Sequence, residues 1–62
     1  IMNKEELIKK LQDKINEKEQ VKNQYYKTGY ENYDEEFWIK TMSYLDGIIW
    51  AYKDAIKELG EQ

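Results

Sequence analysis

The segment from Tyr25 to Trp38 holds most of the side chains in this sequence that are suited to molecular recognition. Its fourteen residues include six of the nine aromatic residues and four of the thirteen acidic residues. Tyrosine and tryptophan often dominate the binding energy of protein interfaces, and carboxylates attract basic partners. We therefore predict a protein-binding surface in this segment, with five contact residues: Tyr26, Tyr30, Glu31, Tyr33 and Glu35.

The same segment also has a purely structural interpretation. Tyr25, Phe37 and Trp38 are expected to close one end of a helical hairpin, where aromatic rings bury much apolar surface. Asp34 is expected to begin a helix, because a carboxylate there accepts hydrogen bonds from free backbone N–H groups. The aromatic residues could thus serve the fold, a partner, or both.

Other kinds of chemistry are excluded by missing residue types, since the chain has no Cys, His, Arg or Pro. It lacks a thiolate, an imidazole for a triad or metal site, and the guanidinium that grips phosphate. The acidic residues do not follow calcium-loop spacing, and a two-helix hairpin has no catalytic cleft. We predict that the protein is not an enzyme and has no catalytic residues, cofactor or metal site.

Charge is unevenly distributed along the chain, whose net charge is −3. Residues 1–27 carry seven Lys and five acids, whereas residues 28–62 carry three Lys and eight acids. Lys14, Lys18 and Lys22 form an i,i+4 row that could contact phosphate or an acidic partner, or pair with acids of the second helix or another subunit. This balance disfavours nucleic-acid binding, and the acidic turn is too sparse to favour mimicry of DNA.

The first of two expected helices covers about residues 4–27. Asn3 is its predicted N-cap, with Glu6 three residues later and a hydrophobic staple between Met2 and Leu7. Gly29 is expected to end the helix in a left-handed conformation. Its predicted apolar stripe comprises Leu7, Ile8, Leu11, Ile15, Val21, Tyr25 and Tyr26.

The second expected helix covers about residues 34–59 and has a more regular pattern. Its apolar seam follows alternating steps of four and three and comprises Trp38, Met42, Leu45, Ile49, Tyr52, Ile56 and Leu59. Three further residues widen the seam on one flank: Thr41, Ile48 and Ala55. Asp34 is the predicted N-cap, Tyr33 and Trp38 form a staple, and Gly60 is expected to close the helix.

A short turn over about residues 28–33 predicts that the helices are antiparallel. The fold class is therefore all-α, a two-helix antiparallel hairpin within a single domain, 1–62. Aligning the two stripes places Lys18 and Lys22 beside Leu45 and Met42, with their stems along apolar surface and their ammonium groups in water.

One hairpin has little interior, so we predict that a homodimer completes a four-helix bundle with coiled-coil-like packing. A ridge of small residues on the outer face, opposite the seam, offers a contact centred on Gly47. An antiparallel two-fold crossing there pairs Lys40 with Asp54, Tyr44 with Trp50, and Ser43 with Ala51 of the other copy. Alternatively, Gly47 is a helical glycine that the fold tolerates.

The sequence has no run of eighteen apolar residues and no segment typical of a signal peptide. We therefore expect a soluble cytoplasmic protein without membrane contact, and its Lys-rich composition favours a bacterial or phage source. Its predicted role is to dock, without catalysis, onto an unidentified larger protein as a modulator or inhibitor. The alternative is a purely structural subunit of a self-assembling oligomer.

Overall fold

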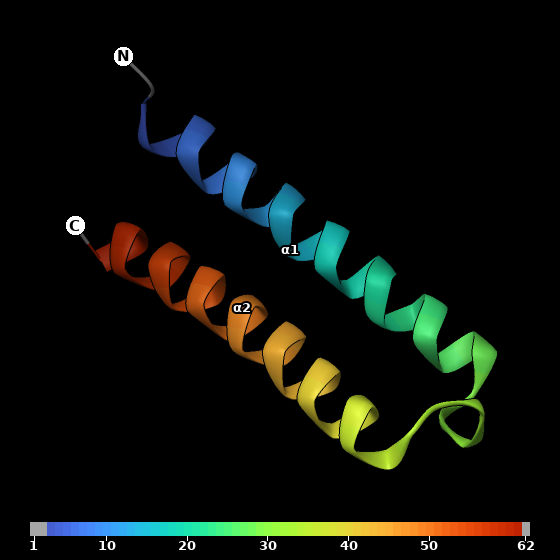
Figure 1. The fold of residues 1–62 in the computed structure, drawn as a ribbon. Helices are drawn as coiled ribbons and strands as arrows, with labels where there is room; N and C mark the ends of the chain where they lie inside the picture. Colours follow the sequence, from blue (N-terminus) through green and yellow to red (C-terminus); the bar gives the residue numbers. More distant parts are fainter. Residues whose placement is uncertain (1–2, 62) are drawn as a thin grey trace.

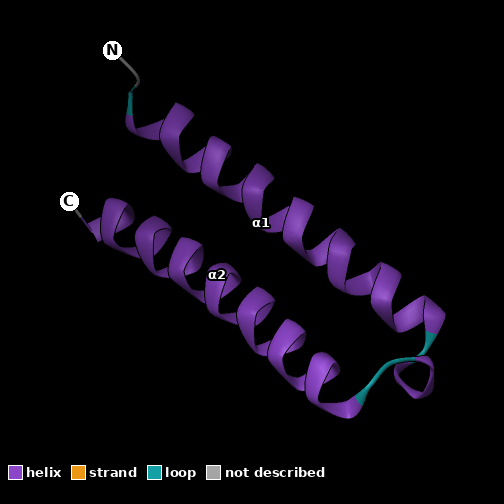
Figure 2. Cartoon of the chain, viewed as in Figure 1, coloured by secondary structure: helices purple, strands orange, loops and turns teal. Residues whose placement is uncertain are grey.

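The computed structural model describes residues 3–61, which form an antiparallel helical hairpin (Figure 1). Helix α1 covers Lys4–Thr28, a 3-10 helix η1 covers Tyr30–Asn32, and α2 covers Glu35–Glu61. The hairpin measures 44 × 16 × 16 Å, and its turn lies at the end opposite both termini (Figure 2). The predicted all-α hairpin is confirmed, and its turn contains a helical element that the sequence did not indicate.

Both predicted helix starts are confirmed by capping hydrogen bonds. The side-chain oxygen of Asn3 accepts from the N–H of Glu6 at 2.8 Å, and Asp34 accepts from the N–H of Phe37 at 3.2 Å. These bonds satisfy backbone donors that have no partner within the helix. The staple proposed for Met2 lies outside the described residues.

The ends of the two helices differ in how well they were predicted. Gly29 follows α1 with a positive φ of 93°, as expected, and its N–H donates to the carbonyl of Tyr25 at 3.0 Å. Gly60 was wrongly expected to close α2, because the helix continues through it to Glu61. A glycine inside a helix costs only about 1 kcal/mol, which is too little to end a helix unaided.

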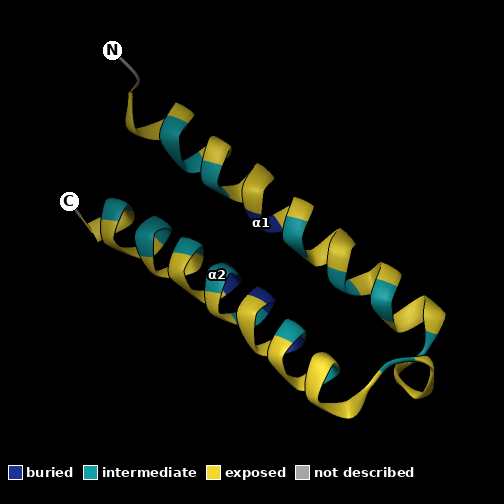
Figure 3. Ribbon diagram, in the orientation of Figure 1, coloured by how far each residue is buried: buried dark blue, intermediate teal, exposed yellow. Residues whose placement is uncertain are grey.

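The hairpin core is thin and lies midway along the facing sides of the helices (Figure 3). Among the described residues, the buried apolar side chains are Ile15, Met42, Leu45 and Ile49. The α2 seam is confirmed, because every predicted seam position is buried or half-buried, as are the flanking residues. Three of the four core residues come from α2, so this helix supplies most of the interior.

The predicted stripe of α1 is correct only in part. Val21 and Tyr26 are 41% and 56% exposed, whereas Lys18 and Lys22 are half-buried. The steps of four and three that include Ile15 continue through the two lysines, so Val21 lies beside the seam rather than in it. Val21 was wrongly included in the stripe, whereas the half-burial of the two lysines agrees with the predicted alignment, which laid their stems along apolar surface.

An ion pair joins the helices at one of these lysines. Lys22 Nζ donates to Asp46 Oδ1 at 2.5 Å, with side-chain exposures of 22% and 49%. This hydrogen bond raises the pKa of Lys22 above its ordinary value of 10.5, although partial burial acts in the opposite direction. The contact ties the middle of α1 to α2 and shows that one lysine of the predicted row serves the hairpin itself.

Candidate functional site

Short-range hydrogen bonds fix the turn that carries the predicted binding residues. Asn32 Nδ2 donates to the carbonyl of Thr28 at 2.5 Å, and its backbone N–H donates to the carbonyl of Gly29 at 3.1 Å. The N–H of Tyr33 donates to the carbonyl of Tyr30 at 3.0 Å. These bonds supply partners for carbonyls at the end of α1 and hold η1 in place.

Gly29 and Glu31 are in close contact within this turn. A Cβ atom added at Gly29 would lie 2.7 Å from Oε1 of Glu31, so the carboxylate lies directly over the glycine. Glycine is favoured here by its positive φ, which side chains with a Cβ rarely adopt, whereas the Glu31 carboxylate is the end of a flexible side chain and could move aside. In this arrangement one carboxylate lies near the end of α1.

All six aromatic residues of the segment form one network of ring contacts, made of two groups of three. In the Phe37 group, Tyr33 stacks on Phe37 at 5.7 Å, and Tyr25 lies 5.4 Å from Tyr33 and 6.2 Å from Phe37 between ring centroids. The second group, called the Trp38 group, comprises Tyr26, Tyr30 and Trp38. The two groups meet where the ring centroids of Tyr33 and Trp38 lie 5.8 Å apart. The network connects both helices to the turn. Of the three rings expected to close this end of the hairpin, Tyr25 and Trp38 are half-buried, but Phe37 is 45% exposed, so burial of Phe37 was wrongly predicted.

The Trp38 group forms an open groove at the tip of the hairpin. The ring centroids of Tyr26 and Tyr30 lie 5.6 and 6.0 Å from that of Trp38, and their planes are inclined to it by 68° and 60°. Tyr26 is 56% and Tyr30 64% exposed. The residues lining this groove are Tyr26, Lys27, Thr28, Gly29, Tyr30, Glu31 and Trp38.

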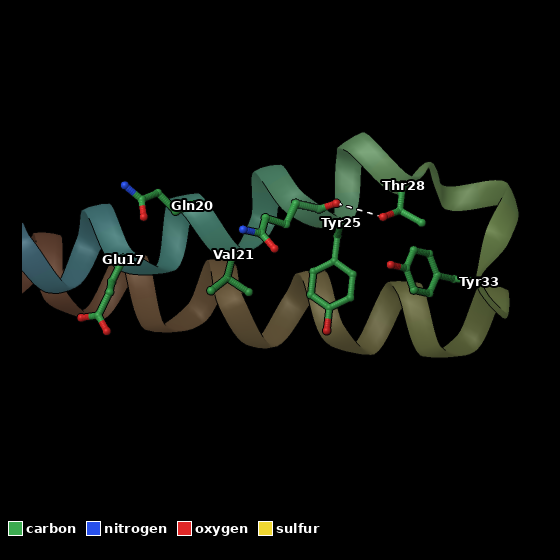
Figure 4. A pocket seen from close by; sticks show the side chains of 7 residues that line it. Glu17, Gln20, Val21, Tyr25, Thr28 and Tyr33 are labelled. Carbon is green, nitrogen blue, oxygen red and sulfur yellow. Dashed lines mark hydrogen bonds between the residues drawn. The ribbon is translucent and has the colours of Figure 1, made fainter.

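A second groove borders the Phe37 group along α1 (Figure 4). Tyr25 points from α1 towards α2, and the Thr28 hydroxyl donates to the carbonyl of Gln24 at 3.2 Å. The rest of the lining combines two polar side chains with an aliphatic and an aromatic one: Glu17, Gln20, Val21 and Tyr33. Since Tyr25 and Tyr33 are both half-buried, this groove offers less aromatic surface than the Trp38 group.

The structure thus gives the five predicted partner-binding residues different surroundings. Tyr26, Tyr30, Glu31 and Glu35 are exposed, whereas Tyr33 is half-buried and contacts three other rings. Trp38 was not among the predicted partner-binding residues, yet it lines the groove together with Tyr26 and Tyr30. The predicted hydrophobic staple between Tyr33 and Trp38 was the one sequence feature that indicated a position for Trp38 beside the turn.

The residues predicted for self-association all lie on exposed surface of α2: Lys40, Ser43, Tyr44, Gly47, Trp50, Ala51 and Asp54. A Cβ added at Gly47 would have nothing within 4 Å, so the ridge is open. Lys40 pairs with Glu36 at 2.8 Å within the helix, and Lys53 Nζ lies 5.4 Å from the Trp50 ring centroid. The surface is therefore open to a second copy. Lys40, which the predicted crossing pairs with Asp54 of that copy, already has a partner within its own helix.

Within residues 3–61, no three acidic side chains converge into a group suited to holding a metal ion. No helix in the described part of the chain is long and apolar enough to cross a membrane. Comparisons with protein-family models, curated proteins and solved structures give no match.

Proposed function

We propose that this hairpin acts by docking its turn onto another protein, without catalysis. The observation that carries the proposal is the exposure of Tyr26 and Tyr30, which are held by Trp38 beside the carboxylate of Glu31. Rigidly held aromatic side chains make effective interface anchors, because little side-chain freedom remains to be lost on binding. The partner would be a larger protein in the source cell, with the hairpin as its bacterial or phage-encoded modulator.

Charge at the turn supports a basic partner surface. Residues 28–39 contain four acids and no basic residue. Glu31 and Glu35 are exposed, and Asp34 remains exposed while it caps α2. An acidic tip of this kind would speed encounter with a basic patch and orient the hairpin on it.

Site-specific photo-crosslinking in the source cell tests this proposal. A p-benzoylphenylalanine replacing Tyr30 should crosslink one larger protein, whereas the same probe replacing Tyr44 should not. Tyr44 is the matched control, because its exposure of 67% is close to the 64% of Tyr30. Crosslinks from both positions to copies of the hairpin alone would contradict docking.

Self-assembly is the second candidate, and the thin core favours it. Four buried side chains in residues 3–61 give little apolar stabilisation, while Ile39, Tyr44 and Trp50 remain more than half exposed. A second copy covering the outer face of α2 would complete a four-helix bundle. If the helices cross at Gly47, Gly47→Leu should convert a dimer to a monomer in sedimentation velocity, and an unchanged dimer would exclude that crossing.

A further inference from the structure

We propose that the Trp38 group is an aromatic cage for a cationic side chain, arginine or lysine, from a basic segment of the partner protein. This inference rests on the proposed docking function and names the chemistry that the turn would recognise. The cationic side chain would contact the rings of Tyr26, Tyr30 and Trp38 and pair with the carboxylate of Glu31.

Ring geometry provides the first support. Tyr26 and Tyr30 each contact Trp38 at a steep angle, and within residues 3–61 no ring contact joins the two tyrosines directly. All three rings line the same groove, so a side chain that enters it would contact Tyr26, Tyr30 and Trp38 together. Aromatic faces carry negative charge density and attract a cation placed within about 6 Å of the ring centroid.

Electrostatics provides the second support. Glu31 contributes a formal negative charge at the groove, where its carboxylate lies over Gly29. The groove also lies at the C-terminal end of α1, where the helix dipole places partial negative charge. Both effects favour a positively charged occupant over a neutral one of the same shape.

Lys27 is the one basic residue in the groove lining, and it opposes such an occupant. Its side chain is exposed, and the cation–aromatic contact found in residues 3–61 involves Lys53 and Trp50 rather than Lys27. Lys27 therefore leaves the ring faces accessible while reducing the local negative potential. Removing the Lys27 charge should therefore strengthen binding of a cation, whereas removing a cage residue should weaken it.

NMR titration with two short peptides tests the cage: acetyl-Gly-Arg-Gly-amide and its counterpart with citrulline, which is neutral and nearly isosteric. The arginine peptide should shift the ring signals of Tyr26, Tyr30 and Trp38 and bind about tenfold more tightly than the citrulline peptide. The Trp50 indole, in the same molecule, serves as an internal reference. Equal binding of the two peptides would overturn the proposal.

Variants assign the effect to the cage. Tyr30→Leu and Glu31→Gln should each weaken arginine-peptide binding about two- to fivefold, and Lys27→Gln should strengthen it about twofold. Tyr44→Leu, a matched exposed tyrosine on α2, should leave it unchanged. An equal loss with Tyr44→Leu would overturn the cage, and circular dichroism establishes that each variant is folded.

The two proposals can fail separately. If position 30 crosslinks a cellular protein but arginine and citrulline peptides bind equally, docking stands and the cage is wrong. If the arginine peptide binds selectively but position 30 crosslinks nothing except the hairpin, the cage stands as a cation site and the docking function is wrong.

Discussion

The aromatic residues of this hairpin occupy two regions with opposite organisation. At the turn, six rings contact one another and connect α1, η1 and α2. On the outer face of α2, Tyr44 and Trp50 are 67% and 63% exposed, and the contact found for Trp50 is with Lys53 of the same helix. The turn rings therefore support the fold and also present surface, whereas the outer rings present surface only.

The two regions show that a side chain can be exposed with or without support from a neighbouring ring. Tyr30 and Tyr44 have nearly equal exposure, yet only Tyr30 is braced by another ring. A braced side chain loses less conformational entropy when a partner binds, which favours the turn over the outer face as the proposed docking surface. The outer face remains suited to a second copy, whose own side chains would supply the missing support.

The two tryptophans give the largest expected contrast. Trp38→Ala should lower the free energy of unfolding by about 2–3 kcal/mol, because it removes the shared floor of the ring network. Trp50→Ala should change it by less than about 0.5 kcal/mol in a hairpin that does not self-associate. Urea unfolding followed by circular dichroism measures both values at low protein concentration.

Equal losses in the two variants would contradict this contrast and show that Trp50 is buried in an assembled form. Repeating the Trp50→Ala measurement over a range of protein concentrations separates these cases. If the loss of unfolding free energy in Trp50→Ala grows with protein concentration, self-association causes it, since the stability of an oligomer depends on protomer concentration.

Two of the three glycines, Gly29 beside α1 and Gly47 within α2, provide the next contrast. Gly29→Ala should destabilise the hairpin by about 1–2 kcal/mol, because its φ is positive and an added Cβ makes that conformation strained. Gly47→Ala should stabilise it by up to about 1 kcal/mol, because the site is helical and open. Thermal unfolding checks both signs, and destabilisation by Gly47→Ala would indicate a close contact at the ridge.

Much of this fold is local enough to be predicted from sequence. The caps at Asn3 and Asp34 and the positive φ of Gly29 each depend on a few neighbouring residues, and the α2 seam follows one uninterrupted spacing. The exposed tyrosines of the turn were also identified from their density. These features succeeded because local sequence and tertiary packing favour the same structure.

The unpredicted features depend on contacts between segments distant in sequence. The stem of Lys22 was expected along the second helix, and pairing with an acid of that helix was one alternative, but the sequence did not indicate that the acid is Asp46. The Trp38 groove likewise requires η1 to bring Tyr30 back over the ring of Trp38. Spacing along one helix cannot specify such a contact, because the path of the turn determines it.

The ion pair gives the smallest expected effect and tests the middle of the hairpin, outside both aromatic regions. Because the folded state raises the pKa of Lys22, its pair with Asp46 stabilises the fold below pH 10.5, and this contribution disappears as pH rises through the raised pKa. Asp46→Asn should cost about 0.5–1 kcal/mol at neutral pH. The difference from wild type, measured by urea unfolding, should shrink above pH 10.5, and a difference independent of pH would exclude the ion pair as its cause.

Residue-resolved photo-CIDNP NMR, which detects solvent-accessible Tyr and Trp rings, tests the central claim most directly. Spectra would be compared at protein concentrations below and above any association detected by sedimentation. We expect Tyr30 and Tyr26 to remain polarised at every concentration, whether or not Tyr44 and Trp50 become protected. Loss of the Tyr30 and Tyr26 signals together with those of the outer face would show that self-assembly covers the turn and would contradict its role as a docking surface.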